Sequence, residues 1–138
     1  MVKTISILGS TGSIGVNALE VISNLENCFT VKYLSTYKNV DLLVSQIKKH
    51  KPKAVAVVDE TAAKKIKSTL DAMGIKLLTG RVGLLDLSQR NDLDLMLNGL
   101  VGASGMQPTI NAIKAGVNVA LANKESLVMA GNIIDKEL

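Results

Sequence analysis

The sequence predicts an α/β protein with a doubly wound, mostly parallel sheet of about six strands and helices on both faces. Three observations support this fold class. Short apolar runs alternate with amphipathic segments along the whole chain, which is the pattern of successive β-α units. Aromatic residues make up only 2% of the chain, so the core consists of Val, Ile, Leu and Ala, as is typical of strands buried on both faces. A glycine-rich turn over residues 9–15 separates the first apolar run from the first amphipathic segment.

Strands are expected at the apolar runs, because short apolar segments bounded by turn residues are typical of buried strands. In chain order they cover residues 4–8, 30–35, 53–58, 75–79, 93–100 and 117–122. The helices expected between them cover residues 15–24, 40–50, 60–73, 82–89 and 108–115, and a last helix is expected over residues 126–138. In the first two helices, the spacing of the apolar residues predicts a stripe that faces the sheet. Its members are Val16, Leu19, Val21, Ile22, Leu43, Val44 and Ile47. Proline or glycine is expected to end three helices, at Pro52, Gly74 and Gly116.

The composition limits the function classes that are open to the chain. With 138 residues, 47% of them hydrophobic and 20% charged, it is long enough for one globular domain. Cys28 is the only cysteine, which excludes a disulfide framework and a thiolate zinc site. No apolar stretch approaches the ~20 residues of a membrane span or has the pattern of a signal peptide, so a cytoplasmic location is expected. Residues 135–138 carry no cap or turn, and the domain 1–138 is therefore expected to be a piece of a longer protein.

Residues 9–15 read Gly-Ser-Thr-Gly-Ser-Ile-Gly and lead into the first helix. Glycine at positions 9, 12 and 15 removes the Cβ atoms that would keep a ligand away from the backbone. Because the N–H groups and the dipole at the start of a helix attract anions, this turn predicts a site for the phosphates of a nucleotide. The spacing is G-x-x-G-x-x-G rather than the G-x-G-x-x-G of the strict dinucleotide motif. A tightly packed corner without a ligand is the alternative interpretation.

The residues after the second strand indicate which nucleotide binds. NAD-binding versions of this fold have an acidic residue here, about 20 positions after the glycines, which binds the ribose 2′-hydroxyl. This sequence has Ser35, Thr36, Lys38 and Asn39 at that point and no carboxylate before Asp41. Since a 2′-phosphate would meet a positive charge and no negative one, the sequence favours NADP(H). The alternative is that Lys38 is a solvated loop residue.

Two further strand ends carry unusual residues. The stretch 101–109 is rich in small residues, which allow a flat ring to approach the backbone, and Pro108 suits the first turn of a helix. After the last strand, Lys124 is a candidate partner for a phosphate or an enolate-like oxygen, with Asn123 and Glu125 as candidates to fix a ribose or nicotinamide. An ordinary β-α turn and an ordinary helix start are the respective alternatives.

Other candidate sites are less favoured. His50 lies among lysines at a helix end, where positive charge is favourable, and no aromatic residues accompany it as in surfaces that bind nucleic acids. Neither Tyr33 nor Tyr37 has a lysine four residues later, so the Tyr-x-x-x-Lys pair of short-chain dehydrogenases is missing. Cys28 precedes the second strand and is therefore expected away from the carboxyl edge of the sheet. No His, Asp or Glu cluster has metal-site spacing.

The glycine turn at 9–15, the pair Lys38-Asn39, residues 101–109 and the string Leu-Ala-Asn-Lys-Glu-Ser-Leu-Val at 121–128 occur in this order. Together they closely resemble the 1-deoxy-D-xylulose 5-phosphate reductoisomerase family. The resemblance spans essentially the whole chain and implies the N-terminal NADPH-binding domain of an oxidoreductase. The family isomerises 1-deoxy-D-xylulose 5-phosphate and then reduces it by hydride transfer. The product is 2-C-methyl-D-erythritol 4-phosphate, an intermediate of non-mevalonate isoprenoid biosynthesis.

The resemblance also assigns roles by position. It implies that the cofactor is bound by Gly9, Thr11, Gly12, Ser13, Ile14, Lys38, Asn39, Asn123 and Glu125, and the sugar-phosphate substrate by Lys124. Catalytic residues and the carboxylates that hold a divalent metal (Mg²⁺ or Mn²⁺) are expected only in the rest of the full-length protein, itself expected to be a homodimer. This chain alone is therefore expected to bind NADPH without turning over substrate.

Tyr37 departs from the family pattern, in which a small residue is usual at this position. Its ring is expected either to stack on adenine or to block part of the adenosine pocket. A freestanding NADP(H)-binding sensor or regulatory module is the alternative function for the whole chain. Neither a nucleic acid nor a membrane is expected as a partner.

Overall fold

The computed structural model describes residues 2–25, 27–100 and 102–121. These residues form a six-stranded sheet with the strand order β4-β3-β2-β1-β5-β6, in which every neighbouring pair is parallel. The strands are β1 (Lys3–Leu8), β2 (Phe29–Thr36), β3 (Ala54–Val57), β4 (Lys76–Thr79), β5 (Leu95–Asn98) and β6 (Asn118–Leu121). The chain builds the sheet outward from β1 to β4 and then returns to add β5 on the other side of β1. The predicted doubly wound parallel sheet is confirmed.

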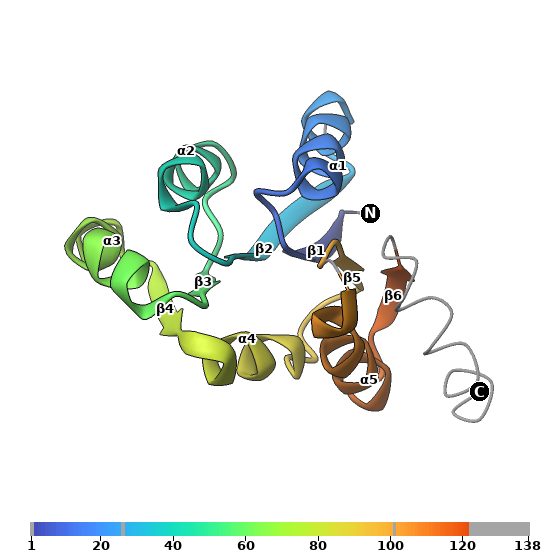
Figure 1. The fold of residues 1–138 in the computed structure, drawn as a ribbon. Coiled ribbons are helices and arrows are strands. Elements are labelled where there is room, and N and C mark those ends of the chain that lie inside the picture. Colours follow the sequence, from blue (N-terminus) through green and yellow to red (C-terminus); the bar gives the residue numbers. More distant parts are fainter. Residues whose placement is uncertain (1, 26, 101, 122–138) are drawn as a thin grey trace.

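The helices lie on both faces of the sheet (Figure 1). They are α1 (Ser13–Asn24), α2 (Val40–His50), α3 (Glu60–Met73), α4 (Gly80–Ser88) and α5 (Met106–Lys114), with a short 3-10 turn, η1 (Gly102–Gly105), before α5. Helices α1, α2 and α3 cover one face, and α4 and α5 cover the other. This division follows from the right-handedness of β-α-β connections, because the chain crosses the sheet in opposite directions in its two halves.

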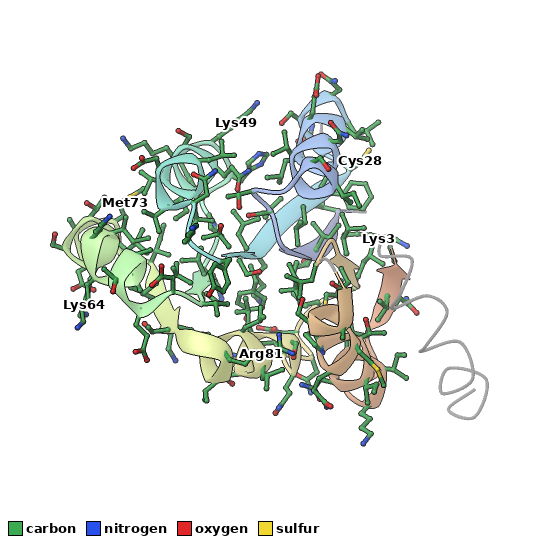
Figure 2. All side chains as sticks on the ribbon, in the orientation of Figure 1. Lys3, Cys28, Lys49, Lys64, Met73 and Arg81 are labelled. Carbon is green, nitrogen blue, oxygen red and sulfur yellow. The ribbon has the colours of Figure 1, made fainter. Side chains whose placement is uncertain are left out.

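Each face of the sheet has its own hydrophobic core. Successive residues of a strand point to opposite faces, so Ile7 of β1 packs in the core with α1, α2 and α3, and Leu8 packs in the other. Both side chains are fully buried. Charged side chains such as Lys49 and Lys64 extend away from the sheet (Figure 2).

Local sequence signals set the helix ends. Asp59 precedes α3 and accepts a hydrogen bond from the Thr61 N–H at 3.1 Å, and Gly74 ends the helix in the left-handed conformation (φ 73°). Helix α2 ends at Lys51, which takes the same conformation (φ 51°) although it is not glycine. Pro52 then prevents further helix. The predicted bounds of α2 and α3 are confirmed.

The expected apolar stripe of α1 is wrong in part. Leu19 is buried and Ile22 packs partly against the core, but Val16 and Val21 are 37% and 56% exposed. Gly15 and Leu19 lie four residues apart on the helix row that faces the sheet. Val16 lies about 100° around the helix from Gly15, and Val21 lies about 160° from Leu19, so both point away from that row.

Smaller differences concern the ends of other elements. Helix α5 begins at Met106, two residues before the expected start, because η1 leads directly into it, and Pro108 lies in its first turn as expected. Strand β5 is shorter than the expected 93–100. The helix expected from Ser126 lies outside the described residues. Within the described ranges, no helix has both the length and the apolar character needed to cross a membrane.

Candidate nucleotide-binding site

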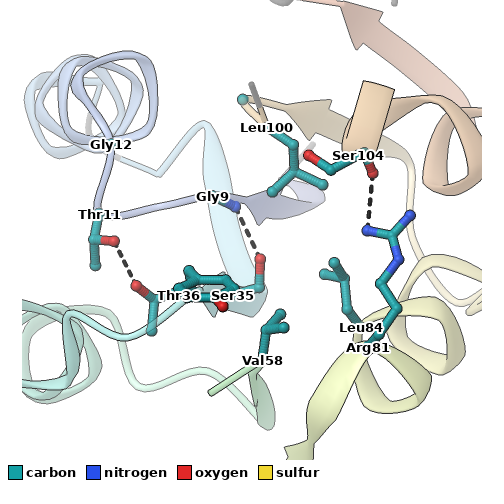
Figure 3. A pocket seen from close by; sticks show the side chains of 12 residues that line it. Gly9, Thr11, Gly12, Ser35, Thr36, Val58, Arg81, Leu84, Leu100 and Ser104 are labelled. Atoms are coloured by element: carbon teal, nitrogen blue, oxygen red, sulfur yellow. Dashed lines mark hydrogen bonds between the residues drawn. The ribbon is translucent and has the colours of Figure 1, made fainter. Parts of the chain in front are cut away.

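A cavity of about 470 Å³ lies at the carboxyl edge of the sheet. All strands are parallel, so their carboxyl ends meet at this edge, and the order of the strands reverses between β1 and β5. Ligands of open α/β sheets bind in the crevice at such a reversal. The lining comes from the turn after β1, the ends of β2, β3 and β5, the start of α4, and η1. Thr11 and Thr36 lie on one side of the cavity, and Arg81 and Leu84 lie on the other (Figure 3).

The three glycines of the turn after β1 differ in how much space the surrounding backbone leaves for a Cβ atom. Gly9 has a φ of 73°, and a Cβ there would lie 3.1 Å from the Gly99 carbonyl oxygen. A Cβ on Gly15 would lie 2.5 Å from the Ser10 Cα and closer still to the Gly9 carbonyl oxygen. Gly12 is extended (φ −77°, ψ 171°), and its Cβ would make only an ordinary 3.5 Å contact. The fold therefore requires glycine at positions 9 and 15, whereas at position 12 it does not.

Hydrogen bonds from β2 and α2 hold this turn in place. The Gly9 N–H donates to Ser35 Oγ at 2.8 Å, and the Ser10 N–H donates to the Ser35 carbonyl oxygen at 2.8 Å. The buried Gln46 side chain accepts from Ser10 Oγ and donates to the Ser10 carbonyl oxygen, both at 2.8 Å. The Gly12 N–H donates to the Gly9 carbonyl oxygen at 3.2 Å. The N–H groups of Gly9, Ser10 and Gly12 are thus used within the protein.

The start of α1 is arranged differently from the starts of α2 and α3. Asn39 and Asp59 cap α2 and α3 with their side chains, but the N-cap of α1 is Gly12, which has no side chain to offer. The first N–H groups of a helix have no acceptor within the helix, and in α1 these belong to Ser13 and Ile14. Both residues are exposed beside the cavity. This arrangement suits an anion supplied from outside.

The end of β2 brings the predicted 2′-phosphate residues to the same edge. Thr36 Oγ1 hydrogen-bonds to Thr11 Oγ1 at 2.6 Å, and Tyr37, which is 65% exposed, lines the cavity. Lys38 is exposed and lies next to the lining rather than in it. The side-chain Oδ1 of Asn39 accepts from the Leu42 N–H at 3.3 Å, so part of this side chain serves to cap α2.

The far wall of the cavity was not predicted from the sequence. It contains Val58, which follows β3, together with Arg81 and Leu84 of α4. The Arg81 Nη1 group donates to the Ser104 carbonyl oxygen at 2.9 Å and so joins α4 to η1. No local sequence pattern marks these residues, because only the topology of the sheet brings them to the same cavity as the glycine turn.

Asn98 is another residue that the sequence analysis missed. Its side chain is completely buried, and its Nδ2 donates to the Gly105 carbonyl oxygen at 2.6 Å and to Thr109 Oγ1 at 2.7 Å. Its Oδ1 accepts from the Leu100 N–H at 3.0 Å. Asn98 therefore holds Gly105 and Thr109, which belong to the small-residue stretch 101–109 singled out in the sequence. A lone amide at the end of an apolar strand is the signal that would have found it.

The remaining candidate residues either lie outside the described residues or lie at another edge of the sheet. Asn123, Lys124 and Glu125 follow β6, whose carboxyl end lies at the same edge, but they are outside the described residues. Cys28 lies at the opposite edge, as predicted, where its carbonyl oxygen accepts from the Lys3 N–H at the start of β1. Within the described part of the chain, no group of His, Cys, Asp or Glu could hold a metal ion.

The clearest pKa shifts also lie away from the cavity. Burial raises the pKa of Tyr33, and its hydrogen bonds to Asp92 raise it further. Burial alone would raise the pKa of Asp92, but hydrogen bonds from Lys32 and Tyr33 and the charge of Lys32 outweigh it and lower the pKa. Burial and the neighbouring Lys49 charge lower the pKa of His50. Tyr33, Asp92 and His50 are not among the described residues that line the cavity.

Comparison with known proteins identifies the family. The family model described as 1-deoxy-D-xylulose 5-phosphate reductoisomerase matches residues 5–131. The chain belongs to this family. The 1-deoxy-D-xylulose 5-phosphate reductoisomerase of Chloroherpeton thalassium is 46% identical over 132 residues, which cover 96% of this chain and 34% of that protein. The same enzyme from Halothermothrix orenii is 43% identical over 138 residues, 100% of this chain and 36% of that protein.

Solved structures of reductoisomerases share the fold. The enzyme from Zymomonas mobilis in complex with NADPH superposes with a TM-score of 0.89 at 31% identity, over 99% of this chain and 36% of that one. A reductoisomerase in complex with NADPH, fosmidomycin and magnesium gives a TM-score of 0.88 at 30% identity, over 99% of this chain and 34% of that one. The chain thus spans about a third of the length of its reductoisomerase relatives. The resemblance noted in the sequence is confirmed.

Proposed function

We propose that this chain is the NADPH-binding portion of a 1-deoxy-D-xylulose 5-phosphate reductoisomerase. The whole enzyme would isomerise 1-deoxy-D-xylulose 5-phosphate and reduce it to 2-C-methyl-D-erythritol 4-phosphate, in non-mevalonate isoprenoid biosynthesis. The observation that carries the proposal is Gly12, a helix cap that the fold does not require to be glycine, beside a cavity at the reversal of the strand order. A related reductoisomerase of the same fold was solved with NADPH bound.

The described residues fit a dinucleotide. The pyrophosphate would lie at Gly12 and accept hydrogen bonds from the N–H groups of Ser13 and Ile14, with Thr11 close by. The adenosine part would occupy the cavity, whose walls include Val58 and Leu84. Bound there, the cofactor supplies the hydride for reduction.

The residues after β2 would set the preference for NADPH. Between Thr36 and Val40 there is no carboxylate, and Lys38 supplies a positive charge near the expected 2′-phosphate. The nearest acid on the adjacent strand end is Asp59, which caps α3 by accepting from the Thr61 N–H, so that the positive end of this helix offsets part of its charge. A 2′-phosphate would therefore be attracted at this position, and the preference should weaken as salt screens the exposed charge.

The proposal is tested by titrating the 138-residue chain with NADPH and with NADH while its thermal unfolding is followed. A ligand at 100 times its dissociation constant that binds only the folded state stabilises it by about 2.7 kcal/mol. We expect stabilisation by NADPH at concentrations where NADH has little effect. Lys38→Ala should weaken NADPH binding about five- to tenfold and leave NADH binding unchanged. Lys64→Ala, on the exposed side of α3, is the matched control. Equal shifts with both nucleotides would refute the role of Lys38, and no shift with either would refute the proposed function.

The residues outside the described ranges complete the proposal. Asn123 and Glu125 would contact the cofactor, and Lys124 would contact the sugar phosphate. The catalytic residues and the carboxylates for Mg²⁺ or Mn²⁺ would belong to the rest of the enzyme, a cytoplasmic homodimer. The isolated chain would then bind NADPH but not oxidise it when 1-deoxy-D-xylulose 5-phosphate and Mg²⁺ are added. Measurable NADPH oxidation under these conditions would contradict this assignment.

A further inference from the structure

Arg81 is the only charged side chain among the described residues that line the cavity. It lies in the first turn of α4, on the wall opposite Thr11 and Thr36 (Figure 3). The residue is half-buried, and no carboxylate of the described residues forms an ion pair with it. An arginine facing a largely apolar cavity without an acidic partner is poorly explained by stability alone.

The structure holds this guanidinium in a defined position. The Arg81 Nη1 group donates to the Ser104 carbonyl oxygen at 2.9 Å, which fixes one edge of the planar group. A guanidinium carries five N–H donors, so a single bond to one carbonyl leaves most of its donors and both of its faces for another partner. Gly80, just before it, has a φ of 79°, which directs the chain from β4 into α4.

The surroundings of Arg81 match a flat heteroaromatic ring better than a phosphate. Leu84 lies one turn further along α4 and is 2% exposed, and Val58 and Leu100 also line the cavity. Apolar walls favour a ring, which gains from burial and from stacking against a planar cation. The N–H groups suited to phosphates lie across the cavity, at the start of α1.

We propose that Arg81 binds the adenine of the dinucleotide, with its guanidinium against the purine ring and its position fixed by the Ser104 carbonyl. The inference rests on the proposed function, because it places the adenosine part in this cavity. The inference adds a residue that binds the base and so allows the site to discriminate adenine nucleotides from other phosphorylated compounds.

The test measures dissociation constants by calorimetry on the 138-residue chain, with adenosine 2′,5′-bisphosphate and with NADPH. Arg81→Met keeps the length of the side chain but removes its charge and its planar group, and Arg81→Lys keeps the charge alone. We expect Arg81→Met to weaken both ligands about five- to tenfold, with no change in the dependence of binding on salt, and Arg81→Lys to remain at least threefold weaker than wild type. Arg90→Met, beyond the other end of α4, is the matched control, and its affinities should equal those of the wild type.

The outcomes separate the two proposals. Full affinity in Arg81→Lys, together with a reduced salt dependence in Arg81→Met, would show that Arg81 pairs with a phosphate and would overturn the inference. A lower melting temperature of Arg81→Met without ligand, at wild-type affinity, would show that Arg81 only joins α4 to η1, and would also overturn it. If the wild-type chain binds neither ligand, the proposed function fails as well.

Discussion

Replacing the glycines of the turn after β1 by alanine, one at a time, tests whether Gly12 serves a ligand. In Gly15→Ala the new methyl group would lie 2.5 Å from the Ser10 Cα and closer to the Gly9 carbonyl oxygen. Because both are backbone atoms, neither can rotate away. Overpacking of this kind costs about 1–3 kcal/mol, and the better helix propensity of alanine returns less than about 1 kcal/mol. We therefore expect Gly15→Ala to lower the free energy of unfolding by about 2 kcal/mol.

Gly12→Ala should instead weaken the binding of NADPH and leave the stability of the fold nearly unchanged. Its backbone angles are allowed for alanine, and its methyl group would meet only the Gly9 carbonyl oxygen at an ordinary 3.5 Å. Alanine lowers the conformational entropy of the unfolded chain, which stabilises the folded state by about 0.4–1 kcal/mol. Alanine is also a weaker N-cap than glycine, which costs a similar amount. The free energy of unfolding should thus change by less than about 0.5 kcal/mol. NADPH, however, should bind at least tenfold more weakly, a loss of about 1.4 kcal/mol, because the methyl group would lie where we propose that the pyrophosphate approaches.

Urea unfolding without ligand and calorimetric titration with NADPH measure the two effects separately. Gly74→Ala is a suitable control, since a Cβ there has no neighbour within 4 Å and the residue lies at the end of α3. Its left-handed backbone (φ 73°) should cost about 1 kcal/mol of stability without changing the affinity for NADPH. If Gly12→Ala loses as much stability as Gly15→Ala, glycine at position 12 serves the fold. If it binds NADPH like the wild type, the phosphates do not approach at this point, and in either case the reasoning is refuted.

Three further predictions concern hydrogen bonds seen in the structure. Tyr33→Phe should lower the free energy of unfolding in urea by about 1 kcal/mol, because the part-buried hydroxyl donates to the carboxylate of Asp92, with its two oxygens at 2.8 and 3.0 Å. An unchanged midpoint would contradict this. The pKa of Asp92 is lowered on folding, so its contribution to stability is present above the unfolded pKa of about 3.9 and is lost as the pH falls through the folded value. Asp92→Asn should therefore flatten the loss of stability below about pH 4, and an unaltered acid limb in pH-dependent urea unfolding would exclude this account. Asn98→Ala should cost about 2–4 kcal/mol, measured in the same way, since two buried hydrogen bonds and one part-buried hydrogen bond are lost. A loss below about 1 kcal/mol would show that the amide is dispensable.

The sequence was informative wherever the cause of the structure is local. The bounds of α2 and α3 follow from apolar spacing together with Asn39, Asp59 and Gly74, all of which act on adjacent backbone. The parallel sheet follows from the alternation of the elements, because consecutive parallel strands require a crossing helix. The exposure of Val21 was not predicted, because the spacing of apolar residues does not show which row of α1 packs against the sheet.

The predicted phosphate corner was right in its location but incomplete in its causes. Ser35 and Gln46 hold the turn, although they lie 25 and 36 residues beyond Ser10. Neither has a local signal, because a serine in a strand and a glutamine in a helix are ordinary residues. Arg81 and Asn98 are similar cases, since each acts on a segment that reaches it only through the topology of the sheet. A sequence read segment by segment shows where a ligand meets the backbone, but not which distant side chains hold that backbone.

These distant side chains determine how the site can bind. Because Ser35 and Gln46 already engage the N–H and carbonyl groups of the turn, a phosphate that binds at Gly12, as proposed, would not have to order the loop first. The loss of conformational entropy when a loop becomes ordered is a large part of the cost of binding. A turn that is already ordered in the free protein avoids this cost, so its contacts with a ligand contribute more to affinity. The same bonds limit which groups can contact the ligand, since the N–H groups of Gly9 and Ser10 are no longer available to it. The specificity of the proposed site would therefore come from the start of α1, from Tyr37 and Arg81 in the walls of the cavity, and from Lys38 next to its lining.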